Sequence, residues 1–86
     1  MEKHEYSDFE KAIYYIDKKE YTKAIAYLRK EVEDDNPDAI FHLALMYWEG
    51  LGVESDFSEA KSLIYNAKQR KHPLGDMYWD IISAYE

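Results

Sequence analysis

The residues of this chain that could carry out chemistry lie far apart in the sequence. The three histidines are His4, His42 and His72. None of them has two further ligands at a spacing that would complete a metal triad. Asp34, Asp35 and Asp38 lie close together, but they lack the alternating ligands and central glycine of a calcium loop. We therefore expect no metal site.

Other candidate groups also lack the surroundings that catalysis needs. Asp17 with Glu20, and Asp76 with Asp80, can share a helix face, but paired carboxylates without an apolar pocket are usually just solvated. Gly50-Leu51-Gly52 has no strand before it, as a dinucleotide-binding turn would require. The common nucleophile and phosphate-loop motifs do not occur. The sequence thus predicts a protein that is not an enzyme and binds no cofactor.

Composition favours one small, folded, cytoplasmic domain spanning residues 1–86. Hydrophobic residues make up 47% and aromatic residues 16% of the chain, which is too apolar for a disordered protein. No apolar run approaches the roughly 20 residues that span a membrane, and the polar start is not a secretory signal. There is no cysteine to form a disulfide. The net charge of −7 disfavours direct nucleic-acid or membrane binding and favours either a basic partner or simply solubility.

Capping signals and apolar periodicity divide the chain into five helices. Ser7 with Glu10, and Asp56 with Glu59, are spaced as capping boxes. The expected helices run from just after Ser7 to Asp17, from about Tyr21 to Glu33, from Pro37 to Gly50, from just after Asp56 to before His72, and from Pro73 to about Tyr85. Connections this short make neighbouring helices antiparallel. The predicted fold is all-α, with two and a half antiparallel helical hairpins.

The sequence also repeats itself without gaps at an offset of 36 residues. Tyr21-Thr22-Lys23-Ala24 falls on Phe57-Ser58-Glu59-Ala60, and Pro37 falls on Pro73. A period of this length is typical of a helical-hairpin solenoid, in which each unit packs against its neighbours. We expect one repeat at about 7–35, a second at about 37–71 and a capping helix at about 73–86.

Residues 39–67 resemble the SEL-one-like repeat, a relative of the tetratricopeptide repeat. The matching positions are Ala39, Leu43, Tyr47, Gly50, Gly52, Val53, Asp56, Ala60, Leu63 and Ala67, whereas Ala44 and Glu59 stand where the family has glycine and lysine. The first hairpin is more similar to the tetratricopeptide type. The resemblance implies a right-handed superhelix with a protein-binding or scaffolding role and no enzymatic residues.

In such a fold, the first helix of each pair would line a concave face that binds a partner protein. The family pattern assigns this face to Phe9, Ile13, Phe41, Leu45, Trp48, Glu49, Met77 and Ile81. The aromatic members Phe41 and Trp48 are the best anchor candidates. A second interpretation stays open, in which the same residues form internal core or a self-association surface. Helix five carries Asp80 and Ser83 where the preceding repeat has Ala44 and Tyr47, so it is expected to act as a polar cap of a complete small protein.

Acidic residues suggest an alternative function. Glu31, Glu33, Asp34, Asp35 and Asp38 are crowded together, in a segment without lysine or arginine between Lys30 and Lys61. These residues could be simply solvated, or they could steer a basic partner. The leading hypothesis is an adaptor that binds through the concave face. The alternative is an acidic inhibitor, or immunity-type protein, that blocks a basic nuclease or nucleic-acid-binding site.

Overall fold

The computed structural model describes residues 6–85, and over this range the chain is all-α. The helices are α1 (Asp8–Asp17), α2 (Tyr21–Glu33), α3 (Pro37–Glu49), α4 (Phe57–Gln69) and α5 (Gly75–Ser83). No strand occurs between residues 6 and 85, as the sequence predicts. His4 and Glu86 lie outside the described residues.

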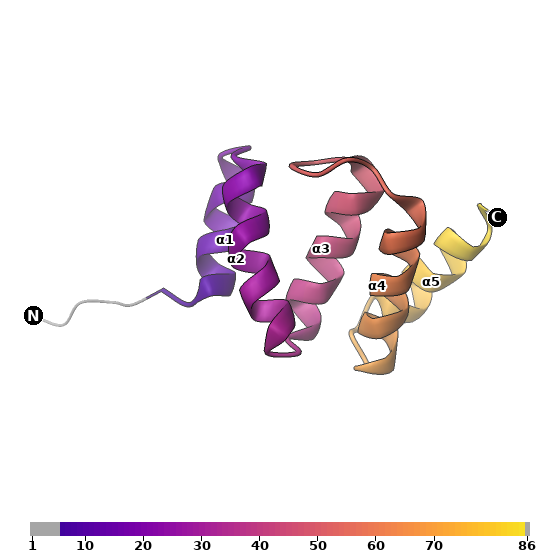
Figure 1. Ribbon diagram of the computed structural model, residues 1–86. Helices are drawn as coiled ribbons and strands as arrows, with labels where there is room; N and C mark the ends of the chain where they lie inside the picture. The colour runs from indigo at the N-terminus through magenta and orange to yellow at the C-terminus, as the bar shows by residue number, and fades with distance from the viewer. Residues whose placement is uncertain (1–5, 86) are drawn as a thin grey trace, which may run out of the picture.

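Each helix packs against the next one along the chain, and the chain reverses direction at every turn (Figure 1). Ring contacts also link alternate helices, because Phe9 of α1 contacts His42 of α3, and Phe41 of α3 contacts Tyr78 of α5. The all-α class and the five antiparallel helices are therefore confirmed. The superhelical sense stays a prediction.

The 36-residue period is visible in the backbone itself. Helices α2 and α4 begin and end at residues exactly one period apart. The turn after each helix has one residue in the left-handed region, Asp35 at φ 60° and Lys71 at φ 61°. The next amide then donates back to the helix, from Asn36 to Glu31 and from His72 to Ala67, at 3.1 and 3.0 Å. This closure satisfies carbonyls that the helix end leaves free.

The two predicted capping boxes differ in the structure. The first is complete, because the Ser7 hydroxyl accepts from the Glu10 amide and the Glu10 carboxylate accepts from the Ser7 amide. In the second, Asp56 accepts from the Glu59 amide at 3.0 Å, but its own amide donates to the Tyr47 carbonyl instead. In a complete capping box the Asp56 amide would donate to the Glu59 side chain, but here it donates to Tyr47 near the other end of the α3–α4 loop.

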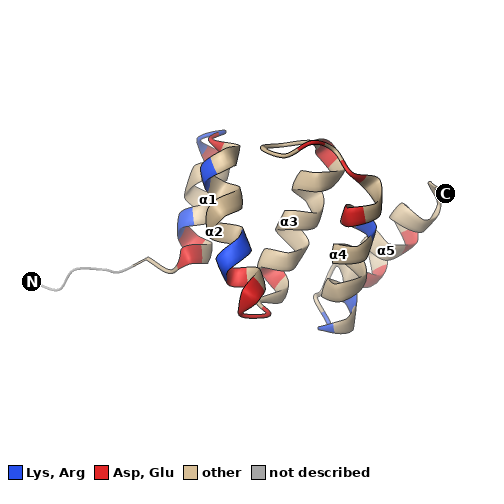
Figure 2. Cartoon of the chain, in the orientation of Figure 1, with Lys and Arg blue, Asp and Glu red and all other residues tan. Residues whose placement is uncertain are grey.

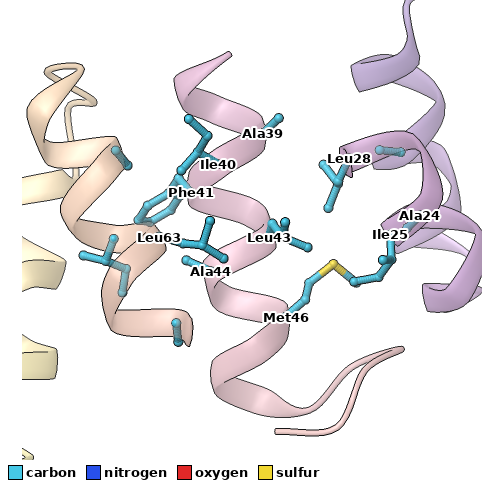
Figure 3. Packing of buried hydrophobic residues seen from close by; sticks show 14 of the residues in the cluster. Ala24, Ile25, Leu28, Ala39, Ile40, Phe41, Leu43, Ala44, Met46 and Leu63 are labelled. Atoms are coloured by element: carbon cyan, nitrogen blue, oxygen red, sulfur yellow. The ribbon is translucent and has the colours of Figure 1, made fainter. Parts of the chain in front are cut away.

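The core lies between helices that approach at alanines. Ala12, Ala24, Ala44 and Ala60 are completely buried, as expected for close helix contacts. Figure 3 shows α3 in the middle of this core, with Leu43 and Met46 directed toward α2 and Phe41 directed toward α4. Taken as whole residues, no polar or charged residue within residues 6–85 is fully buried, although the His72 side chain is only 7% exposed. Helix α3 is therefore the central element of the molecule.

Two glycines close the long α3–α4 loop. Gly50 and Gly52 have φ angles of 72° and 76°, in the left-handed region that the sequence predicts for them. At Gly52 a Cβ atom would also come within 2.8 Å of the Tyr21 backbone. The loop thus returns across the start of α2, where only glycine fits.

Helix α5 is shorter than the sequence predicts. It begins at Gly75 rather than Pro73, because residues 72–74 form a turn in which the Leu74 amide donates to Nδ1 of His72 at 3.1 Å. At Gly75 an added Cβ would lie 2.7 Å from Cα of Lys68. The first residue of α5 is therefore pressed directly against α4.

Candidate protein-binding surface

Aromatic rings connect α1, α3 and α5 along the side of the molecule where the concave face is predicted. The Phe9 ring lies 5.7 Å from His42, and the Phe41 ring lies 4.8 Å from Tyr78. Trp48 also contacts Tyr78, at 6.4 Å between centroids. Phe41 and Trp48 thus lie on the same side of α3 and face the same ring of α5.

Phe41 is part of the core rather than of an open surface. Only 4% of the residue is exposed, because the His72 ring stacks on it at 4.4 Å and Tyr78 meets it edge-on. At this position the structure favours the core interpretation over the groove interpretation. A partner could reach Phe41 only if α5 moved away.

Met77 and Ile81, in contrast, are open to solvent. They are 51% and 40% exposed, and Leu74 and Tyr85 on the same side of α5 are 40% and 69% exposed. The spacing of three and four residues places all four side chains on one stripe. We call Leu74, Met77, Ile81 and Tyr85 the α5 stripe. It holds four of the seven exposed large hydrophobic residues of the described chain.

The remaining predicted residues frame this surface. Leu45 and Trp48 are partly buried, and Trp48 contacts Tyr85 of the α5 stripe at 5.8 Å. Glu49 is exposed at the end of α3. Trp48 and the α5 stripe therefore form one continuous surface. The sequence spacing within each helix does not by itself show this contact between two helices.

On α1, the predicted residues line a cleft of about 670 Å³ at the other end of the molecule. Phe9 and Ile13 are partly buried there. The walls are completed by Tyr6, Glu10, Lys11, Tyr14, Tyr15, Asp17 and Tyr27. Tyr14 and Tyr27 were not predicted from the sequence. In the structure both rings contact Tyr15, Tyr27 by stacking at 5.7 Å and Tyr14 edge-on at 5.2 Å. The predicted concave face therefore consists of two distinct surfaces in the structure, the cleft at α1 and the α5 stripe.

Three residues of the predicted acidic patch, Glu31, Asp35 and Asp38, have partners within the molecule, although Asp35 and Asp38 are exposed. Glu31 accepts hydrogen bonds from the Phe9 amide at 3.0 Å and from Asn36 Nδ2 at 3.3 Å. Asp35 pairs with Arg70 at 2.7 Å, and Asp38 accepts from Nε2 of His72 at 2.9 Å. These contacts tie α2 and α3 to α1 and to the α4–α5 turn. Glu33 and Asp34 are exposed and remain as candidates for external electrostatics.

The two histidines of the described chain are structural. Burial is the main cause that lowers the pKa of His42, and nearby His72 adds to this effect while Asp38 opposes it. The His72 side chain is 7% exposed, with its Nδ1 accepting from Leu74 and its Nε2 facing Asp38. Both ring nitrogens of His72 therefore hold the turn that starts α5.

A second cluster was not found from the sequence. Lys61 and Lys68 lie 5.4 and 5.6 Å from the centre of the Trp79 ring, and Tyr65 meets the same ring at 5.3 Å. Ser58 and Ser62 complete a shallow hollow of about 320 Å³ beside it. The sequence does indicate part of this cluster, because the spacing of residues 61, 65 and 68 places them on one face of α4.

Residues 6–85 contain no group of three metal-binding side chains that could hold an ion. Over the same residues, no helix has the length and apolar character needed to cross a membrane. A comparison of the chain with protein families, with curated protein sequences and with solved structures found no match in any of the three.

Proposed function

We propose that this protein is a non-catalytic, cytoplasmic adaptor that binds another protein through apolar side chains of α1, α3 and α5. The α5 stripe is the observation that carries this proposal. Its four large hydrophobic side chains, two on the nine-residue helix α5 and one just beyond each end, are 40–69% exposed. A contiguous apolar surface of this kind is typical of a binding site.

The resemblance to the SEL-one-like repeat supports the same proposal. It implies partner binding on the first helix of each pair, which is where Trp48 and the α5 stripe lie. Aromatic residues are enriched among the side chains that dominate binding energy. Trp48 and Tyr85, in contact at 5.8 Å, are therefore the anchor candidates that replace buried Phe41.

The acidic-inhibitor alternative is less favoured by the contacts. Three of its five residues, Glu31, Asp35 and Asp38, already have partners within the molecule, although Asp35 and Asp38 stay largely exposed. The two functions predict different effects of substitution, and one capture experiment separates them.

The test is quantitative capture of partners from host lysate with the wild-type protein and two matched double variants. Met77→Gln with Ile81→Gln removes apolar side chains, and Glu33→Gln with Asp34→Asn removes exposed charge. We expect the first variant to lose the captured protein by about tenfold or more and the second to retain it. The reverse pattern would support the inhibitor and contradict the adaptor. Circular dichroism would verify that both variants stay helical.

A further inference from the structure

Met77 and Ile81 are the two exposed large hydrophobic residues of α5. They are equivalent to residues of α3 on the side that faces α5. Met77 and Ile81 lie 36 residues after Phe41 and Leu45. Phe41 is buried because His72 and Tyr78 cover it. No helix among residues 6–85 covers Met77 in the same way, and Met77 is half exposed. The α5 stripe is therefore an unoccupied packing surface for one more helix.

The opposite flank of α5 does not share this character. Asp76, Asp80 and Ser83 lie one repeat after Ile40, Ala44 and Tyr47, and both aspartates are exposed. The apolar part of the end surface is thus a narrow stripe rather than a whole face. A single helix packed along α5 would cover it. From Leu74 to Tyr85 the stripe spans about 16 Å, which matches three helical turns.

Charge indicates the chemistry of that helix. No lysine or arginine occurs from residue 36 to residue 56 or from residue 73 to residue 86. Helices α3 and α5 carry only acidic charges, Asp38, Glu49, Asp76 and Asp80, while the cations lie on α1, α2, α4 and the turns after α1 and α4 (Figure 2). The charges that α3 and α5 place beside the α5 stripe are therefore all negative, whereas Lys61 and Lys68 of α4 contact α5 at Trp79.

The same charges disfavour a second copy of this chain as the occupant. Two α5 helices packed together would bring Asp76 and Asp80 near the same residues of the other copy, and like charges across an interface are repulsive. At the other end of the molecule, α1 and the residues just before it present exposed Tyr6 and Tyr14 beside the cleft described above, together with polar Glu10 and Lys11. The charge argument therefore applies to a second copy packed α5 against α5, and a copy packed α5 against α1 would appear as a dimer in the light-scattering test below.

We infer that the α5 stripe binds an amphipathic helix of a partner protein, with apolar side chains at helical spacing and lysine or arginine on its flanks. This inference rests on the proposed function and makes it specific. The partner helix continues the row of helices at the α5 end. Its apolar face packs on Met77 and Ile81, and its cations lie near Asp76 and Asp80. Helix-in-groove recognition of this kind uses anchors at i, i+3, i+4 and i+7.

The test uses two synthetic peptides of about four helical turns. One has leucine on one face and lysine on its flanks, and the other has glutamate in place of every lysine. We expect the lysine peptide alone to bind, with amide chemical-shift changes concentrated on α5 and Trp48. Met77→Gln with Ile81→Gln should weaken it by about tenfold or more, and Asp76→Asn or Asp80→Asn by about two- to fivefold each. Tyr65→Gln, at an exposed aromatic of α4, is the matched control and should leave the affinity unchanged.

Several results would overturn the inference. Equal binding of both peptides, shift changes spread over Glu33 and Asp34, or insensitivity to the Met77/Ile81 variant would each do so. So would a wild-type dimer in light scattering that the Met77/Ile81 variant converts to a monomer, because the occupant would then be a second copy. If the lysine peptide fails but a lysate partner is still lost with the Met77/Ile81 variant, the adaptor function stands and the chemistry inferred for its partner is wrong.

Discussion

Individual side chains in this protein serve contacts between repeats more often than the sequence suggests. Asp35, Asp38 and Glu31 look like an exposed acidic cluster, but each has a partner on another element. His42 and His72 look like isolated surface histidines, yet both pack against Phe41. The carboxylate partners on other elements come from residues 22 to 35 positions away.

His42 makes stability depend on pH. Because burial lowers its pKa in the folded protein below the usual 6.5, the unfolded chain binds the proton more readily. We expect the contribution of neutral His42 to the free energy of unfolding to be fully present above pH 6.5. This contribution should decrease as the pH falls from 6.5 through the lower pKa of the folded state. Urea denaturation between about pH 7.5 and about pH 5.5 would measure this.

The variant His42→Gln isolates the effect. Its stability should change less over the same pH range than that of the wild-type protein, because glutamine does not titrate. A wild-type protein that gains stability on acidification relative to the variant would contradict the pKa direction.

At the scale of the helices, the repeat is defined by how each helix ends. Three non-glycine residues, Lys19, Asp35 and Lys71, have φ near +60° directly after α1, α2 and α4. A residue with a Cβ pays about 1–2 kcal/mol for this conformation. The chain therefore keeps mild backbone strain at each of these turns, whereas the α3–α4 loop uses Gly50 and Gly52.

Replacing one of these residues with glycine should stabilise the protein. For Lys71→Gly we expect a gain of about 0.5–1 kcal/mol, after the added flexibility of glycine in the unfolded chain is subtracted. Thermal unfolding should show a rise of a few degrees, since about 1 kcal/mol shifts the Tm of a domain this small by about 4–8 °C.

The matched control is Lys30→Gly, the same chemical change inside α2. It should destabilise the protein by about 0.5–1 kcal/mol, because glycine is a poor helix former. If Lys71→Gly lowered the Tm as Lys30→Gly does, the left-handed turn would not be a source of strain.

For the whole molecule, stability is expected to be distributed over equivalent positions of the two repeats. Leu28 of α2 and Ile64 of α4 lie one period apart, and both are completely buried. They pack beside alanines at similar helix contacts, Ala24 and Ala60. The one core cluster therefore contains similar side chains at positions one period apart.

Leu28→Ala and Ile64→Ala should each cost about 2–5 kcal/mol and should agree within about 1 kcal/mol. A domain of this size has a total stability of about 4–13 kcal/mol, so either variant removes a large share of it. Chemical denaturation of both variants provides the comparison. Values differing by several kcal/mol would show that the two positions are not equivalent.

Sequence reasoning predicted helices better than surfaces. The bounds of α2, α3 and α4 were predicted to within a residue or two because capping residues and glycines act locally. The start of α5 was missed by two residues, since it depends on the contacts of His72 with Leu74 and of Gly75 with Lys68. Phe41 and Met77 occupy equivalent positions of the repeat, but Phe41 is buried because α5 packs on it, whereas Met77 is exposed.

The amino-acid sequence by itself determined the all-α class, the five helices, the 36-residue period and the closely packed alanines, because capping, periodicity and side-chain size act over a few residues. Only the tertiary structure decided which apolar side chains stay exposed and which carboxylates are paired. Exposure depends on whether another helix covers a side chain, and for Met77 and Ile81 no helix among residues 6–85 does. That uncovered α5 stripe is the physical reason for proposing a binding protein.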